Sequence, residues 1–480
     1  MQPLHILLLI VSYFSVLIFI SYITGKSADN KTFFKANNSS PWYLVAFGMI
    51  GASLSGVTFI SVPGWVEAQS MSYFQMVLGY VVGYAIIGLI LLPLYYKLNL
   101  TSIYTYLEDR FGRYSYKTGA SFFLLSRTIG AAFRLFLVAN VLQVILFDAY
   151  GIPFWVTVSI TILLIWLYTF KGGIKTIVWT DTLQTLFMLI AVGVCIYTIS
   201  DEMQIDRLFS YISESKLSKI FFFDDVSAGN YFWKQFLSGA FIAVVMTGLD
   251  QDMMQKNLTC RNLKDAQKNM FWFTIVLVIV NFFFLALGVL LTDYAQKNGI
   301  DAHKDQLFPL IATQGNLGLA TALFFLLGLI AAAYSSADSA LTSLTTSFSI
   351  DILEIDKKED KKLQEKIRKK IHIVFSVVLV LIILIFKYFI ADESVIANIF
   401  KAAGYTYGPL LGLYAFGLFT KLQVKDKMVP FICLLAPVLT FIISYHSLQF
   451  FNFDFGFFVL VLNGFFTFIG LSLFKRKVNG

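Results

Sequence analysis

Apolar segments recur along almost the whole chain, and they limit its fold more than any other feature. Each is about 20 residues long, which is the length that a helix needs to cross the ~30 Å hydrocarbon core of a bilayer. Hydrophobic residues make up 58% of the 480 residues and charged residues only 14%. Because a helix satisfies its own backbone hydrogen bonds, the pattern predicts an all-α polytopic membrane protein with about thirteen transmembrane helices. The predicted helices are 3–24, 41–65, 72–98, 118–147, 152–170, 174–199, 230–255, 269–293, 317–350, 371–390, 394–420, 427–446 and 449–474.

Lysine and arginine occupy alternate loops, which predicts how the helices are oriented. These residues gather on the cytoplasmic side of a membrane. Segment 1–5 has neither, whereas Lys26, Lys31 and Lys35 follow the first helix, so we expect a multi-pass plasma membrane protein with its N-terminus outside and its C-terminus inside. The other basic positions of the predicted inner loops are Arg110, Arg113, Lys117, Lys171, Lys175, Lys256, Arg261, Lys264, Lys268, 357–370, Lys421, Lys425, Lys427 and 475–477.

This topology accounts for the formal charge of +8, which therefore indicates a lipid bilayer as partner and no nucleic acid. Catalytic motifs are missing from the sequence. The four histidines are scattered, no HExxH, nucleophile elbow or P-loop occurs, and the three cysteines have no paired spacing. We expect no enzyme activity and no catalytic residue, and nothing in the sequence indicates an obligate protein partner.

The second predicted helix is interrupted by small and polar residues. Glycine favours an unwound centre whose backbone carbonyls turn toward a cation. Small residues also let helices pack closely in lipid, and the sequence alone does not decide between the two interpretations. The residues concerned are Gly48, Gly51, Gly56, Ser53, Ser55 and Thr58.

The ninth predicted helix places polar side chains inside an apolar segment. Ser335, Asp338 and Ser339 have the spacing i, i+3 and i+4, so they share one helical face. Ionisable residues within a membrane indicate a functional site, and hard oxygen ligands suit an alkali cation better than zinc or copper. Asp181, near the start of the sixth helix, adds a second carboxylate, although it could equally be a helix N-terminal residue at the membrane surface.

Four motifs in order give the chain a resemblance to the sodium:solute symporter family, which includes sodium-coupled sugar, proline, pantothenate, iodide and sialic acid carriers. They are LNLTSIYTYLEDRFG at 98–112, GGIKTIVWTD at 172–181, SSADS at 335–339 and GYTYGPLLG at 404–412. The resemblance implies a LeuT-type core of two inverted five-helix repeats. The expected units are an extra helix 1–25, a first repeat 41–200, an extracellular loop 201–229, a second repeat 230–421, and two further helices with a short tail at 427–480.

The resemblance also implies Na⁺ as the coupling ion and two sites for it. The first would use the carbonyls of Gly51, Leu54 and Ala332 and the hydroxyls of Ser335 and Ser336. The second, found in some relatives, would involve Asp181, Ser335, Asp338 and Ser339. Asp338 departs from the Ser or Thr of the sugar and sialic acid carriers. It could strengthen the second site, take up a proton, or pair with a basic side chain.

Contacts to a small-molecule solute are expected from four regions. They are the interrupted helix (Ser53, Ser55, Thr58), the third helix (Tyr73, Phe74, Gln75), the fourth helix (Arg127, Arg134) and the eleventh helix (Lys401). Lys401 stands where similar sugar carriers have a substrate-binding Gln. Relatives that carry sialic acid use an Arg of the fourth helix for the carboxylate, and an ungapped comparison places it nearest Gly130.

Each arginine has a rival role. Arg127 could snorkel or bridge to an acidic group, and Arg134 could pair with Asp338 or Asp181. A guanidinium and an ammonium in one cavity favour an anionic solute such as a sugar acid. The alternatives are a sodium/neutral sugar symporter, a proton-coupled symporter using Asp338 or Asp181, and, outside the transporters, a channel or a transporter-like sensor.

Overall fold

The chain folds into a bundle of helices. The structure is a computed structural model that describes residues 3–25, 30–170, 173–389 and 395–476, and within these ranges it contains no strand. The longer helices are α1 (Pro3–Thr24), α3 (Trp42–Ser53), α4 (Gly56–Gln69), α5 (Tyr73–Ile86), α8 (Arg113–Leu142), α9 (Phe154–Thr169), α10 (Ile174–Glu202), α12 (Phe232–Ala243), α14 (Leu263–Asn298), α16 (Gly318–Ser347), α17 (Lys361–Phe389), α18 (Val395–Phe419), α19 (Val429–Phe451) and α20 (Val459–Leu473). The all-α class is therefore confirmed.

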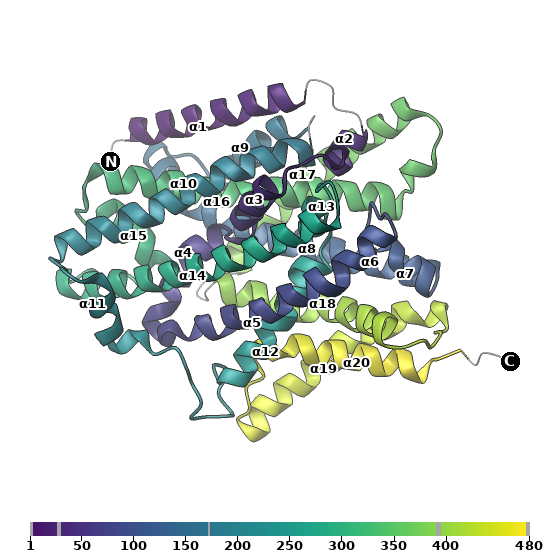
Figure 1. The fold of residues 1–480 in the computed structure, drawn as a ribbon. Coiled ribbons are helices and arrows are strands. Elements are labelled where there is room, and N and C mark those ends of the chain that lie inside the picture. Colours follow the sequence, from purple (N-terminus) through teal and green to yellow (C-terminus); the bar gives the residue numbers. More distant parts are fainter. Residues whose placement is uncertain (1–2, 26–29, 171–172, 390–394, 477–480) are drawn as a thin grey trace.

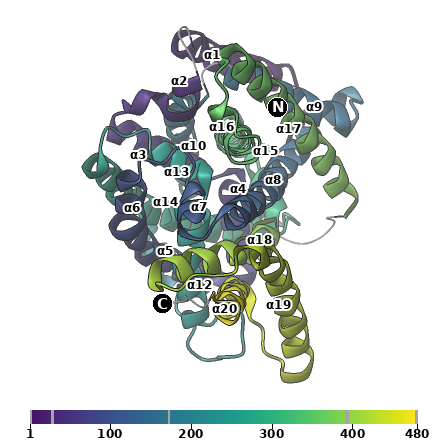
Figure 2. The same ribbon diagram turned by 90° about the vertical axis from the view of Figure 1, so that its right-hand side faces the viewer.

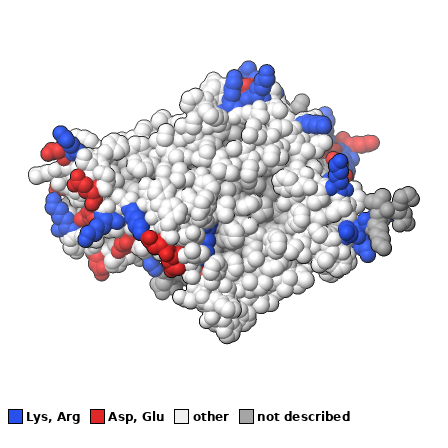
Figure 3. All heavy atoms as spheres, turned by 60° about the horizontal axis from the view of Figure 1, so that its bottom comes forward, with Lys and Arg blue, Asp and Glu red and all other residues white. Residues whose placement is uncertain are grey.

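On the face that Figure 3 shows, charged side chains gather toward the two ends of the molecule and at its upper edge, and a broad uncharged band lies between them. Such a band is what a bilayer core requires, because a charge at its centre is costly. By length and composition, nine helices of the described part of the chain could cross a membrane, or ten if one bent pair is counted as a single crossing. The number of thirteen crossings stays a prediction.

Two of the apolar segments are broken in the middle. The first break lies between α3 and α4, where Ser55 is extended (φ −62°, ψ 172°) and interrupts the helix. The second lies between a π-helical turn at Val244–Gly248, which follows α12, and the short helix α13 (Gln251–Asn257), and the two parts meet at 69°. These are the second and seventh predicted helices, in which glycine and polar residues interrupt the apolar pattern.

The helices surround the two breaks. In both views α1 lies at the top of the bundle and α19 and α20 lie at the bottom, while α16 runs through the interior (Figures 1 and 2). Residues Thr321 to Ser347 of α16 include a long run of buried positions, several of them hydroxyl-bearing. The interior of the bundle is therefore partly polar, and α16 supplies much of that polarity.

Acidic Glu354 connects two elements at one end of the bundle. Its carboxylate lies 2.5 Å from Lys117 and 3.1 Å from Arg113 at the start of α8, and 3.0 Å from Lys357. The hydrogen bonds from Lys117 and Lys357 lower the pKa of Glu354 to about 2. The carboxylate is thus ionised at neutral pH and holds α8 against the segment that follows α16.

Glycines let α5 and α12 approach each other closely. A Cβ added to Gly79 would lie 2.0 Å from the carbonyl oxygen of Phe236, and one added to Gly239 would lie 2.1 Å from that of Met76. Both distances are too short for two non-bonded heavy atoms, so an alanine at either position would force the two backbones apart. Close packing through small residues is a main source of helix association in lipid.

We therefore predict that Gly79→Ala lowers the thermal stability of the purified protein, by about 1–3 kcal/mol, since overpacking of a close contact carries that cost. Differential scanning fluorimetry in detergent measures it. Gly193→Ala is the matched control, because a Cβ there meets no atom within 4 Å. Equal melting temperatures for the two variants would contradict the described packing of α5 on α12.

Candidate functional site

The break between α3 and α4 exposes backbone carbonyls to side chains of α16. The last four carbonyls of a helix have no partner within it. At this break the hydroxyl of Ser336 lies 3.5 Å from the carbonyl oxygen of Ala52, in the last turn of α3. Neither group is open to solvent. The break thus presents oxygen atoms to a dry part of the interior.

The same stretch of α16 also contacts both sides of the break. A Cβ on Gly51 would lie 3.4 Å from the Ser335 hydroxyl, and one on Gly56 would lie 3.6 Å from the backbone of Ala333. Carbonyl and hydroxyl oxygens of this kind suit a hard cation such as sodium. The structure therefore brings together the two segments that hold the residues predicted for the first sodium site, Gly51, Leu54, Ala332, Ser335 and Ser336.

Asp181 of α10 lies beside this region and has three partners. It accepts hydrogen bonds from Ser335 at 2.6 Å and, more weakly, from Ser339 at 3.5 Å. Its third partner is the ammonium of Lys256, at 2.7 Å. Asp181 is completely buried and lies seven residues after the start of its helix, so it is not a helix N-terminal residue.

The prediction that Lys256 lies in a basic inner loop is wrong. Lys256 belongs to α13, and only 1% of its side chain is exposed. The physical reason is the carboxylate of Asp181, which offsets the cost of burying the ammonium. The predicted seventh helix ends at residue 255, and Lys256 looks like a loop residue in the sequence because its partner lies 75 residues away.

Asp338, the second carboxylate of the predicted second sodium site, faces a different neighbour. Tyr168 of α9 donates a hydrogen bond of 2.8 Å to it, and the hydroxyl of Ser339 lies 3.3 Å away. Among the ion pairs of the described residues, none involves Asp338. The basic side chain that reaches this region pairs with Asp181 instead.

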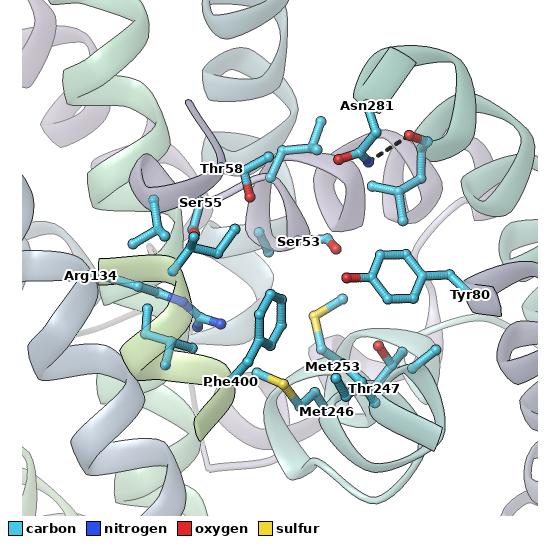
Figure 4. A pocket seen from close by; sticks show the side chains of 18 of the residues that line it. Ser53, Ser55, Thr58, Tyr80, Arg134, Met246, Thr247, Met253, Asn281 and Phe400 are labelled. Carbon is cyan, nitrogen blue, oxygen red and sulfur yellow. Dashed lines mark hydrogen bonds between the residues drawn. The ribbon is translucent and has the colours of Figure 1, made fainter. Parts of the chain in front are cut away.

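A cavity of about 80 Å³ lies on the other side of the break (Figure 4). Hydroxyl groups of the broken helix border it, as the sequence predicts for Ser53, Ser55 and Thr58. Tyr73 also lines it and is hydrogen bonded to Tyr80 at 3.0 Å. The lining residues that sequence reasoning missed include Tyr80, Tyr84, Ile242, Met246, Thr247, Met253, Asn281 and Phe400.

The two arginines of α8 have different surroundings, although both border the cavity. Arg127 forms a buried ion pair with Asp252 of α13. This matches the alternative prediction that Arg127 bridges to an acidic group. Arg134 has no acidic partner among the described residues, and its Nε and Nη1 atoms have no hydrogen-bond acceptor there. Figure 4 shows its guanidinium between Ser55 and Phe400, directed toward the cavity. Buried donors without acceptors are uncommon and call for an explanation.

Three predicted solute contacts lie outside this cavity. Phe74 packs on Phe282, and Gln75 is bound to the backbone of Ser72, Phe222 and Asn230, so it holds the loop before α12. Lys401 lines a separate pocket of about 530 Å³. Neighbouring residues of a helix point about 100° apart, so Phe74 and Lys401 can point away from the cavity although Tyr73 and Phe400 line it.

Four aromatic side chains separate the cavity from the pocket of Lys401. Phe400 contacts Tyr73 and Phe457, with ring centroids 6.4 Å and 5.1 Å apart, and Trp65 lies 6.2 Å from Phe457. Tyr73 and Phe400 line the cavity, whereas Trp65 and Phe457 line the pocket. This aromatic layer, made of Trp65, Tyr73, Phe400 and Phe457, therefore closes the direct path between them.

Comparison with known proteins identifies the family of the chain. The family model of the sodium:solute symporter family matches residues 33–425. The chain belongs to this family. It is 26% identical over 475 residues to the sodium/sialic acid symporter NanT of Aliivibrio fischeri, covering 95% of this chain and 90% of that protein. The sodium/sialic acid symporter SiaT of Proteus mirabilis is also 26% identical, over 82% of this chain and 80% of its own length.

Solved structures give the fold. The symporter superposes on a substrate-bound, outward-open Na⁺-coupled sialic acid symporter with a TM-score of 0.82 and 20% identity, over 98% of this chain and 99% of that one. Mhp1, a nucleobase-cation-symport-1 family transporter, gives a TM-score of 0.55 at 13% identity, over 93% of each chain. The symporter thus has the LeuT-type fold, is a multi-pass membrane protein, and uses sodium to move a small-molecule solute.

Proposed function

We propose that this symporter carries an anionic solute, a sugar acid or related carboxylate, together with sodium into the cell. The observation that carries the proposal is Arg134, whose buried guanidinium borders the cavity with two nitrogen atoms lacking acceptors. A carboxylate satisfies such a group through paired, charge-assisted hydrogen bonds. The sodium/sialic acid symporters among its relatives support the same class of solute.

The polar groups around Arg134 suit the rest of a sugar acid. Ser53, Ser55, Thr58 and Tyr80 offer hydroxyls that can exchange hydrogen bonds with those of a sugar. The cavity of about 80 Å³ is far smaller than the roughly 300–1,000 Å³ of ordinary ligand sites, so side chains must move when the solute enters. Phe400 is the obvious one, since it lies in both the cavity wall and the aromatic layer.

Sodium would bind at the first predicted site, between the carbonyls of Gly51, Leu54 and Ala332 and the hydroxyls of Ser335 and Ser336. Ser53 and Ser55, whose hydroxyls would bind the solute, lie in the same break. An ion that orders the break would therefore also order the solute site. Shared ordering gives the two ligands a coupling free energy, typically 1–3 kcal/mol. Rocking of the repeats 41–200 and 230–421 would then open the cavity inward.

The distribution of basic residues among the loops supports an orientation with the N-terminus outside and the C-terminus inside the plasma membrane. In this orientation the pocket of Lys401 faces the outside and forms an entrance above the aromatic layer. Its lysine would attract an anion there without contacting the bound solute in the cavity. The protein acts as a transporter and not as an enzyme, with no requirement for nucleic acid or a protein partner.

The sodium site predicts the effect of Ser336→Ala. Loss of one ligand should raise the sodium concentration for half-maximal stabilisation about tenfold, equivalent to about 1.4 kcal/mol. Folding should be intact, because the hydroxyl makes only a weak contact of 3.5 Å in the protein. The measurement is the rise of melting temperature with sodium, at constant ionic strength in choline chloride. Ser343→Ala is the matched control, since that buried hydroxyl of α16 bonds to Ala340 of its own helix; equal sodium curves for both variants would reject the site.

The anion site predicts the effect of Arg134→Gln. In a thermal-shift panel of sugars and matching sugar acids in sodium, the wild type should respond to an acid, and the variant should need about a hundredfold more of it, or about 2.7 kcal/mol, because a charged pair is lost. Arg127→Gln is the contrasting variant. It should lower stability itself, since it leaves Asp252 buried without its partner. A response to neutral sugars that Arg134→Gln leaves unchanged would favour the neutral sugar alternative.

A further inference from the structure

The Lys256 ammonium is a buried positive charge that neither the sodium site nor the solute cavity uses. It comes from α13, beyond the second helix break, and lies 2.7 Å from one carboxylate oxygen of Asp181. Both side chains are almost completely excluded from solvent. A buried charge is kept only when it is paired, and here the pair is direct.

This ammonium lies against one carboxylate of the second predicted sodium site. The residues of that site are Asp181, Ser335, Asp338 and Ser339, and the described contacts join them into one cluster: Ser335 and Ser339 to Asp181, and Ser339 to Asp338. Lys256 is bound to the Asp181 oxygen that also faces Ser339. The oxygen atoms that would attract a second sodium ion are therefore already close to a positive charge.

A sodium ion in this cluster would be repelled by the ammonium. Two unit charges about 4 Å apart, at an effective dielectric constant of about 20, weaken binding by about a thousandfold. The first site is less affected. It shares Ser335 with the cluster, but its other oxygens come from the break and from Ser336, which contacts Ala52.

We propose that Lys256 is a tethered second cation, which takes the place of a second sodium ion, so that this symporter binds and moves one sodium per cycle. This inference rests on the proposed function, because it presumes the first sodium site. With a solute that carries one negative charge, such a cycle moves no net charge. Accumulation of the solute would then follow the sodium gradient and not the membrane potential.

The number of bound sodium ions can be counted without knowing the solute. For the purified protein in sodium chloride, with choline keeping the ionic strength constant, the free energy of unfolding rises with the logarithm of sodium concentration, and near saturation the slope gives the number of ions bound. We expect one ion for the wild type and two for Lys256→Gln, which leaves Asp181 free to bind sodium.

Lys234→Gln is the matched control. Lys234 is also a buried lysine, but it donates to the backbone carbonyls of Ser227, Ala228 and Asp454, away from the cluster. It should leave the count at one. Lys256→Arg keeps the charge and should do the same.

The outcomes separate this inference from the proposed function. A wild-type count of two would overturn the tethered cation and leave sodium coupling intact, whereas a count of zero would overturn the first sodium site itself. A count of one for Lys256→Gln would show that the lysine excludes no ion, and would also overturn the inference. If Lys256→Gln does not fold, the wild-type count decides alone.

Discussion

The interior of a membrane protein offers no water to its polar groups, and this constraint organises the structure. Every carbonyl, hydroxyl and charge between the two ends must find its partner in the protein, in an ion or in a solute. Most do so within the chain, as the pairs Arg127–Asp252 and Lys256–Asp181 show. Two kinds of group beside the broken helix matter most: the carbonyls at the end of α3, which a helix end leaves without intrahelical partners, and the guanidinium of Arg134, two of whose nitrogen atoms lack an acceptor. They are the groups to which we assign sodium and the solute.

The break between α3 and α4 links the proposed sodium site to the proposed solute site, because it borders both. On one side its carbonyls meet the hydroxyls of α16, and on the other its serines border the cavity. An ion that fixes the break therefore fixes the serines, and the free energy of one event is available to the other. The contacting rings of the aromatic layer lie between the cavity and the pocket of Lys401.

The sequence was sufficient for the fold class, the family and the place of both helix breaks, because these follow from periodicity, glycine content and local motifs. It was also sufficient to bring Ser335 and Ser336 to the broken helix. It failed where a side chain's direction or a distant partner decides the role. Lys401 follows Phe400, which lines the cavity, but its own side chain lines the separate pocket. Lys256 is buried because it pairs with Asp181, which lies far away in the sequence. No local pattern distinguishes such a lysine from one in a loop.

The central claim is that a sodium gradient drives a carboxylated sugar across the membrane. The most direct test is uptake of radiolabelled sialic acid and of a panel of other sugar acids into proteoliposomes that contain the purified protein, with an inward sodium gradient and with potassium in its place. The account predicts that at least one acid accumulates above its external concentration in sodium and only equilibrates in potassium. Accumulation of neutral sugars alone, or equal uptake in both salts, would contradict it.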